Sequence, residues 1–153
     1  MCIRDRPIRN AEGQATGSFT LVDDYGHHPH EIEATIAAVH TAWPEKRLLV
    51  VFQPHRYTRT RDCFEDFVNL LCQADAVVLA DVYPAGEAPL VGADGRAMAH
   101  AVRLRGQNNL IFCPHIEDVP AAVHKMVRDG DVVLTIGAGS VGRVPAMLVK
   151  ESK

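Results

Sequence analysis

The sequence predicts an α/β fold, in which a mainly parallel sheet carries helices on both faces. From residue 19 onward, short apolar runs alternate with stretches of helical periodicity. The apolar runs are continuous, which is typical of parallel strands that are covered on both faces. A length of 153 residues corresponds to one ordinary domain. Strands and helices that alternate in this way form a parallel sheet with helical crossovers.

Each of five apolar runs is predicted to form a strand, and a helix is predicted after each strand. The predicted strands are Phe19–Tyr25, Arg47–Gln53, Ala76–Tyr83, Asn109–Pro114 and Asp131–Ile136. The predicted helices are Pro29–Trp43, Arg61–Gln73, Gly95–Arg105, Val119–Arg128 and Val141–Lys150. The second helix has an apolar stripe that includes Phe64, Phe67 and Leu71, and Asp62 with Glu65 is expected to form its capping box.

Residues 1–18 differ from the alternating pattern and are expected to be a non-native start or a loop. The segment Met1–Arg6 has no periodicity and resembles adapter-derived starts of translated environmental sequences. Residues 10–18 are rich in Gly, Thr and Ser and predict a loop. The domain itself is therefore expected to span residues 19–153.

Composition excludes several classes of protein. A formal charge of -3 and a pI near 6.2 argue against a general nucleic-acid or membrane surface. The longest apolar runs, such as Leu48–Phe52, are far too short to span a membrane. No charged segment followed by an apolar one predicts a secretory signal, and the four cysteines show no CxxC spacing. We therefore expect a cytoplasmic protein with reduced thiols.

Chemically active side chains gather directly after the first predicted strand. The segment Asp23–His30 reads Asp-Asp-Tyr-Gly-His-His-Pro-His. In open parallel sheets such a turn lies at the carboxyl ends of the strands, where ligands bind. We expect its imidazoles to be hydrogen-bond or proton-transfer partners of an anionic ligand. A zinc site is the alternative, because His27 and His30 are three residues apart, but nearby arginines would repel a cation.

The turn after the second predicted strand is strongly basic. It contains His55, Arg56, Arg59 and Arg61 and leads into the start of a helix, where backbone N–H groups already favour an anion. Guanidinium groups can bind a carboxylate or phosphate through two parallel hydrogen bonds. A solvated charged face is the alternative, but the position at the end of a strand favours an anion site.

Two further turns border the same expected crevice. In Asp81–Glu87, the Glu87 carboxylate either enters the crevice or is an exposed acid on a structural turn. The segment Gly137–Gly142 matches the GxGxxG pattern of dinucleotide-binding proteins. Only eleven residues follow it, without a further strand or a ribose-binding acid. We therefore predict a tight turn beside the site rather than an NAD-dependent oxidoreductase.

Five segments together resemble the C-terminal domain of the Mur ligase family of peptidoglycan synthesis. In chain order they are Asp23–Pro29, Phe52–Asp62, Asp81–Glu87, Gly92–Gly95 and Gly137–Gly142. The resemblance covers about residues 19–150. The run His55–Thr60 is similar to that of the branch that joins L-alanine to UDP-N-acetylmuramate, and it differs from the ligase that recycles murein tripeptide.

The resemblance implies a Rossmann-like domain that closes over a site shared with two other domains, one for the UDP-sugar and one a P-loop ATPase. In that family ATP, with Mg²⁺, converts the muramyl carboxylate to an acyl phosphate, which the amine of L-alanine then attacks. By this resemblance Asp24 would contact the ATP ribose. The amino acid and the reacting phosphate would be surrounded by His27, His55 and Arg56 as catalytic groups and by Tyr25, Arg56 and Arg59 as substrate-binding groups.

The chain departs from the family by containing neither of the other two domains. No P-loop motif is present, so the chain alone is expected to be inactive and to hold neither ATP nor a metal ion. The alternative interpretation is a stand-alone nucleotide- or anion-binding α/β module. An upstream reading frame that continues into a P-loop motif would favour the ligase.

Overall fold

The sheet of this computed structural model, which describes residues 2–151, has six strands in the order β1-β2-β6-β3-β4-β5. The strands are β1 (Cys2–Arg9), β2 (Ala15–Asp24), β3 (Leu48–Phe52), β4 (Ala76–Ala80), β5 (Leu110–Cys113) and β6 (Val132–Ile136). Only the β1–β2 pair is antiparallel among the described residues; the other neighbours are parallel. The predicted parallel sheet is confirmed, and all five predicted strands are present.

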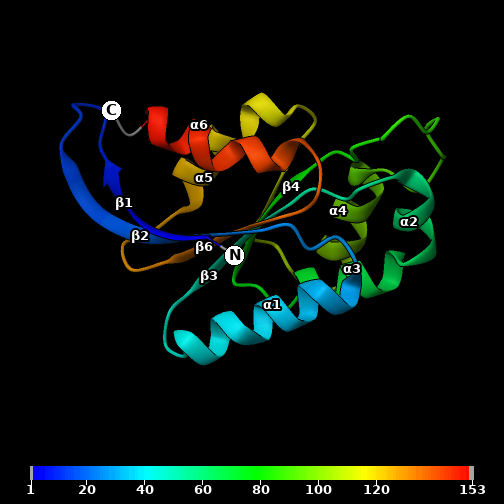
Figure 1. The fold of residues 1–153 in the computed structure, drawn as a ribbon, viewed down its shortest axis with the longest axis horizontal. Coiled ribbons are helices and arrows are strands. Elements are labelled where there is room, and N and C mark those ends of the chain that lie inside the picture. Colours follow the sequence, from blue (N-terminus) through cyan, green and yellow to red (C-terminus); the bar gives the residue numbers. More distant parts are fainter. Residues whose placement is uncertain (1, 152–153) are drawn as a thin grey trace.

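Helices cover both faces of this sheet, as predicted (Figure 1). One face packs against α1 (Pro29–Ala42), α3 (Phe64–Leu71) and α4 (Gly95–Leu104). The other packs against α5 (Val119–Met126) and α6 (Val144–Glu151). The short helix α2 (Tyr57–Asp62) and the 3₁₀ turns η1 (Ile116–Asp118) and η2 (Ser140–Arg143) follow β3, β5 and β6. The turns that leave the strands therefore diverge to opposite faces and leave room for a site between them.

The central strands are apolar along their whole length because both of their faces are covered. Every residue of β3, β4 and β6 is buried. Helix α1 presents Ile32, Ile36 and Val39 to one face of the sheet, and these three side chains are at most 3% exposed. Pro29 occupies its first turn, as predicted, since a proline there loses no helical hydrogen bond.

The expectation of a loop over residues 10–18 is only partly correct. The chain forms an antiparallel hairpin in which Cys2–Arg9 pairs with Ala15–Asp24, and the loop is confined to the tip between them. The sequence does not predict β1, because most side chains of this strand are exposed and the strand needs no apolar face. Whether residues 1–18 are a non-native start stays an untested expectation.

The single helix predicted over Arg61–Gln73 is wrong, because two helices meet at Cys63. The backbone of Cys63 has φ -112° and ψ 19°, which is outside the helical range, and it separates α2 from α3. The expected capping box of Asp62 with Glu65 does not form, since Cys63 is the residue that precedes α3 and no side chain caps it. Helix α2 is thus a separate helix that follows β3 at the carboxyl end of that strand.

A buried ion pair closes the amino end of the sheet. Asp131 is 2% exposed and accepts a 2.6 Å hydrogen bond from Arg47, whose guanidinium also donates to the carbonyl of Met126. The same carboxylate accepts from the backbone N–H of Arg128. These bonds join the turn before β6 to the start of β3, and they lie at the end of the sheet opposite the predicted site.

Candidate active site

The turn after β2 places the histidine-rich segment at the carboxyl edge of the sheet. Tyr25 is 72% exposed, whereas His27 is partly buried and its Nδ1 lies 3.3 Å from the carbonyl oxygen of Tyr25. The backbone N–H of His28 donates to the Glu31 carboxylate, which fixes the start of α1. His27 is thereby held above the edge of the sheet.

Asp24 in this turn is engaged by the protein itself. One carboxylate oxygen accepts a 2.5 Å hydrogen bond from the hydroxyl of Thr35, and the other accepts from the backbone N–H of Tyr25. Each carboxylate oxygen has two lone pairs, so both retain room for a further donor. The shown role of Asp24 is to fasten the turn to α1, and its contact with an ATP ribose stays a prediction.

The basic turn after β3 has an unusual backbone at Arg56. Its φ of 70° and ψ of 140° are values that residues with a side chain rarely adopt. The conformation is held from both sides: the N–H of Arg56 donates to the carbonyl of Tyr83, and its carbonyl accepts from the hydroxyl of Thr60. Strain of this kind concentrates at functional sites, and here it exposes the Arg56 side chain at the edge of the sheet.

Arg59 and Arg61 point to different partners from the same short helix. Arg59 is partly buried and its Nη1 lies 3.2 Å from Nδ1 of His55. Arg61 is exposed and pairs with its neighbour Asp62 at the surface. The structure therefore includes Arg59 in the group around His55 and leaves Arg61 outside it.

The turn after β4 is tied to the turn after β3 by backbone and side-chain bonds. His55 and Tyr83 form a parallel bridge, in which the N–H of Tyr83 donates to the carbonyl of Pro54. Farther along, both oxygens of Glu87 accept from Thr58, one from its N–H and the other from its hydroxyl. Glu87 thus fastens the β4–α4 loop to α2, and of the two alternatives for this residue the structure shows a structural one.

Three aromatic rings from three different turns lie in series at this edge. The ring of His55 lies between Tyr83, which is nearly parallel at 5.5 Å between centroids, and His27, which is tilted at 5.9 Å. Partial burial lowers the pKa of His55 below its ordinary value, and the electrostatic effects of the neighbouring Arg59, His27 and Arg56 lower it further, against Glu87, which raises it. His55 is therefore mainly a neutral imidazole at neutral pH.

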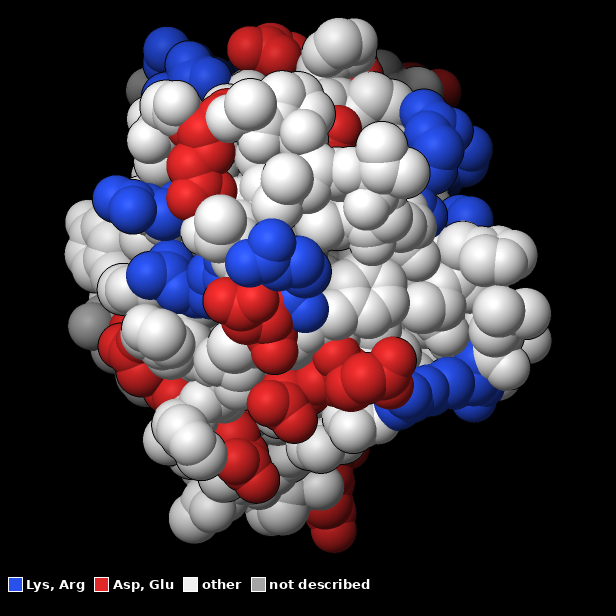
Figure 2. Space-filling view, turned by 90° about the vertical axis from the view of Figure 1, so that its right-hand side faces the viewer, with Lys and Arg blue, Asp and Glu red and all other residues white. Residues whose placement is uncertain are grey.

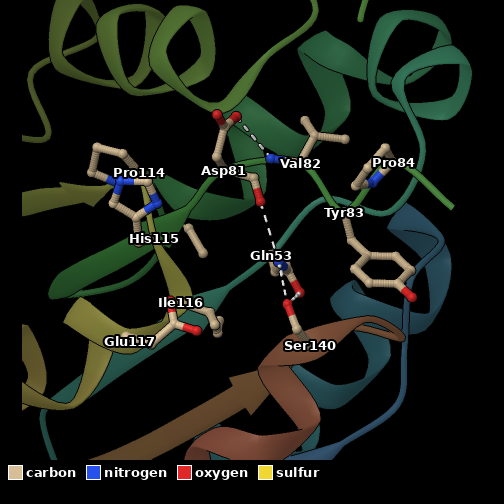
Figure 3. Close-up of a pocket in the computed structure, with 11 residues that line it drawn as sticks. Gln53, Asp81, Val82, Tyr83, Pro84, Pro114, His115, Ile116, Glu117 and Ser140 are labelled. Carbon is tan, nitrogen blue, oxygen red and sulfur yellow. Dashed lines mark hydrogen bonds between the residues drawn. The ribbon is translucent and has the colours of Figure 1, made fainter. Parts of the chain in front are cut away.

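Gln53 connects the turns after β3, β4 and β6 beneath this group (Figure 3). Its side-chain amide donates to the carbonyl of Asp81 and to the hydroxyl of Ser140, and its oxygen accepts from the N–H of Val141. A Cβ on Gly139 would lie 2.6 Å from the Tyr83 ring, so only glycine fits there. The glycine-rich segment is thus a tight turn against the site, as predicted.

A cavity of about 230 Å³ opens next to these turns, on the side of β5 (Figure 3). Its walls come from the ends of β3, β4, β5 and β6 and include Gln53, Tyr83, His115, Glu117 and Ser140. Its walls do not include the histidines and arginines of the predicted site. Tyr83 and Gln53 are the residues that line the cavity and also contact the group around His55 or the turns beneath it. The sequence predicts a crevice bordered by Asp81–Glu87 and Gly137–Gly142, and residues of both segments line this cavity, but it gives no signal for the wall that follows β5.

Charge on this edge of the molecule is mixed. Figure 2 shows the molecule from the side of the carboxyl ends of the parallel strands, with basic side chains left of centre and acidic side chains beside them. Within residues 2–151 no cluster of three or more His, Cys, Asp and Glu side chains has the arrangement of a metal site. No helix in that part of the chain is long and apolar enough to cross a membrane.

Comparison with known proteins decides the family. Residues 11–139 match the family model described as "Mur ligase, glutamate ligase domain". The chain belongs to the Mur ligase family.

Two curated relatives of this Mur ligase domain are UDP-N-acetylmuramate–L-alanine ligases. The chain is 57% identical over 143 residues to the one from Paraburkholderia phytofirmans, with 94% of the chain and 31% of the relative covered. It is 58% identical over 137 residues to the one from Azoarcus sp., with 90% and 29% covered. The chain therefore spans about a third of the length of the curated relatives that it matches.

Solved structures of Mur ligases share the fold. The UDP-N-acetylmuramate-alanine ligase of Thermotoga maritima aligns over 94% of this chain and 28% of its own, with a TM-score of 0.69 and 22% identity. A murein peptide ligase of Psychrobacter arcticus aligns over 88% of this chain and 27% of its own, with a TM-score of 0.64 and 14% identity. At these identities the likeness establishes the fold, and the predicted fold class is confirmed.

All six predicted site residues lie at one edge of the sheet, and the structure adds two residues that sequence reasoning missed. The predicted set lies on the turns after β2 and β3: Asp24, Tyr25, His27, His55, Arg56 and Arg59. Tyr83 and Gln53 join it through the ring contact and the hydrogen bonds above. The roles of all these side chains in binding and catalysis stay predictions.

Proposed function

We propose that this chain is the C-terminal domain of an ATP-dependent ligase that joins L-alanine to UDP-N-acetylmuramate. The observation that carries the proposal is the convergence of His27, His55 and Arg59 at one edge of the sheet, with the Arg56 side chain exposed beside them. The activity that gives the relatives at 57% identity their name supports the choice of substrates. The partners would be L-alanine, UDP-N-acetylmuramate, ATP and the other domains of the same enzyme, and the consumption of ATP supports a cytoplasmic location.

The residues of this chain would serve the amino-acid side of the reaction. ATP and Mg²⁺, held by the other domains, would supply the activated phosphate on the muramyl carboxylate. Arg56 and Arg59 suit the carboxylate of L-alanine and the charge that develops on phosphate oxygens, because a guanidinium binds an oxyanion through paired hydrogen bonds. A neutral imidazole at His55 can donate a hydrogen bond in the same place. Closure of this edge over the other domains would exclude water, which would otherwise hydrolyse an acyl phosphate.

A chimera tests this proposal directly. The chain would replace the corresponding C-terminal segment of the Paraburkholderia phytofirmans ligase, and formation of the UDP-N-acetylmuramoyl-L-alanine amide would be measured. We expect amide formation that requires ATP and L-alanine, and none from the chain alone. A folded chimera that hydrolyses ATP but forms no amide with L-alanine would contradict the proposal.

Arginine variants of the chimera test the site. Arg56→Ala and Arg59→Ala should each lower kcat/KM for L-alanine roughly 10- to 100-fold, because a charged hydrogen bond contributes about 1.5–3 kcal/mol. Arg61→Ala is the matched control. It also removes one arginine from this basic segment, but Arg61 pairs with Asp62 at the surface and does not contact His55. Equal kinetics for all three variants would remove Arg56 and Arg59 from the site.

A further inference from the structure

His55 has an environment that specifies which of its ring nitrogens carries the proton. Nδ1 lies 3.2 Å from Nη1 of Arg59. An arginine side chain has only donors, so this hydrogen bond forms only when Nδ1 is unprotonated and accepts it. A neutral imidazole in this position carries its proton on Nε2. Arg59 lies four residues after His55, about one helical turn away, and the start of α2 brings the two side chains together.

The second constraint on His55 comes from Tyr83, which lies in the Asp81–Glu87 turn and is not among the predicted site residues. The two rings are stacked at 5.5 Å between centroids with 14° between their planes. The stack does not depend on a flexible loop, since the backbones of the two turns are joined by the bonds of Tyr83 to Pro54 and to Arg56. Gly139 lies so close to the Tyr83 side chain that a Cβ there would be 2.6 Å from the ring. The backbone bonds and the close approach of Gly139 therefore restrict the position of the Tyr83 ring independently of its contact with the imidazole.

We propose that Tyr83 is a positioning residue: its ring, together with the guanidinium of Arg59, holds His55 in the tautomer with the proton on Nε2, so that this nitrogen offers an N–H donor to an oxyanion of the substrate. The ring orientation and tautomer follow from the geometry of this chain. The consequence for catalysis rests on the function proposed above. The contact of Tyr83 with His55 is a stacking contact of the two rings, so the ring face performs this role.

The charged groups that face His55 favour the same state. From its own turn come Arg56 and Arg59, from the turn after β2 comes His27, and from the β4–α4 loop comes Glu87. Burial lowers the imidazole pKa most, and three of these four groups, which are cations or can become cations, lower it further. A positioned neutral donor is thus available through the neutral pH range, which a freely rotating histidine would not provide.

The test is the ¹⁵N spectrum of His55 in this chain, labelled at histidine, with and without changes at Tyr83. The wild type should show Nε2 protonated and Nδ1 bare, and Tyr83→Phe should match it because the ring remains. Tyr83→Leu should give a mixture of the two tautomers. A wild-type spectrum with the proton on Nδ1, or a Tyr83→Leu spectrum identical to that of the wild type, would overturn the proposal.

A second variant guards against a misfolded Tyr83→Leu protein. Gly139→Ala adds one methyl group 2.6 Å from the Tyr83 ring and 2.8 Å from Oε1 of Gln53. It should therefore displace the ring and shift the His55 signals without changing His55 or Tyr83 chemically. Gly142→Ala is its control, because a Cβ at that position meets no atom within 4 Å. Unchanged His55 signals in folded Gly139→Ala protein would count against the stacking role.

The kinetic consequence is measured in the chimera. Tyr83→Leu should lower kcat about tenfold or more with a smaller change in the KM for L-alanine, since misplacement of a reacting group affects the chemical step most. Tyr83→Phe should keep the wild-type kcat, because the aromatic ring remains. If the unmodified chimera forms no amide, the proposed function fails while the spectral result still decides whether Tyr83 positions His55.

Discussion

Arg56 shows how a single residue can accept local strain to present its side chain. A positive φ with an extended ψ is comfortable only for glycine, yet an arginine stands there. Two backbone hydrogen bonds and the hydroxyl of Thr60 hold the conformation. The native fold therefore maintains this arginine at a cost in stability, which is the pattern expected where a side chain is needed for function.

The strain at Arg56 can be measured with two pairs of variants. Arg56→Gly should be more stable to unfolding than Arg56→Ala by about 1 kcal/mol, because glycine adopts the left-handed region without a steric penalty. The order should reverse at Arg59, inside α2, where glycine costs about 1 kcal/mol relative to alanine. Urea unfolding of the four proteins compares the free energies. Glycine less stable than alanine at both positions would show that Arg56 is unstrained.

The β4–α4 loop contacts α2 through one carboxylate, that of Glu87, which accepts from Thr58. Hydrogen bonds from the side chain and backbone of Thr58 lower the pKa of Glu87 below its ordinary value of 4.5. A depressed pKa means that the bonds are complete above the ordinary range and are lost as the pH falls through the lower, folded-state value. The loop should therefore remain attached to α2 at neutral pH and loosen in acid.

The pH dependence of this attachment is visible at Thr58. Its backbone N–H signal should titrate with a midpoint below 4.5, and its hydrogen exchange should accelerate, relative to reference amides, as the pH falls through that midpoint. Glu87→Gln keeps the shape of the side chain but not its charge, so the titration should disappear. A Thr58 signal that titrates equally in the Glu87→Gln protein would assign the effect to another group.

Helix α4 is placed by a glycine against the sheet. A Cβ on Gly95 would lie 2.8 Å from the Phe112 ring and 2.9 Å from Cα of Asp81, whose carboxylate also accepts from the N–H of Gly95. Gly95→Ala should destabilise the protein by about 1–3 kcal/mol, since the helix must move. Gly142→Ala, in open space, should be neutral or slightly stabilising. Thermal unfolding of both proteins checks the contrast, and equal effects would contradict the close approach.

Elements buried on both faces were predictable from the sequence, and exposed ones were not. The predicted strand Arg47–Gln53 and the observed β3 differ by one residue at each end, because the run is apolar throughout. Strand β1 was missed because an exposed edge strand requires no apolar pattern. The break at Cys63 was missed because the apolar stripe continues across it.

The candidate site divides in the same way. Local motifs placed His27, His55 and Arg59 on turns that parallel strands must bring together. The stack of Tyr83 on His55 joins residues 28 positions apart, and it depends on the register between two turns. No local pattern encodes that register, so the structure was needed to find it.

At the scale of the whole molecule, the candidate site and a buried ion pair that stabilises the fold lie at opposite ends of the sheet. The Arg47–Asp131 pair closes the amino end and contacts none of the site residues. Asp131→Ala should lower the free energy of unfolding by roughly 3 kcal/mol, because it leaves a largely buried guanidinium without its partner. The His55 spectrum of the folded variant should be unchanged. A changed spectrum would show that the two ends are coupled.

The strand order has a consequence for synthesis of the chain. The last strand, β6, lies between β2 and β3, which precede it by more than 100 and about 80 residues, and it is the only described strand that joins them. A nascent chain that has not yet released Val132–Ile136 from the ribosome holds two pieces of sheet with open edges facing each other. Such edges attract chaperones and neighbouring chains. Premature termination before this strand should therefore yield aggregates rather than a smaller folded domain.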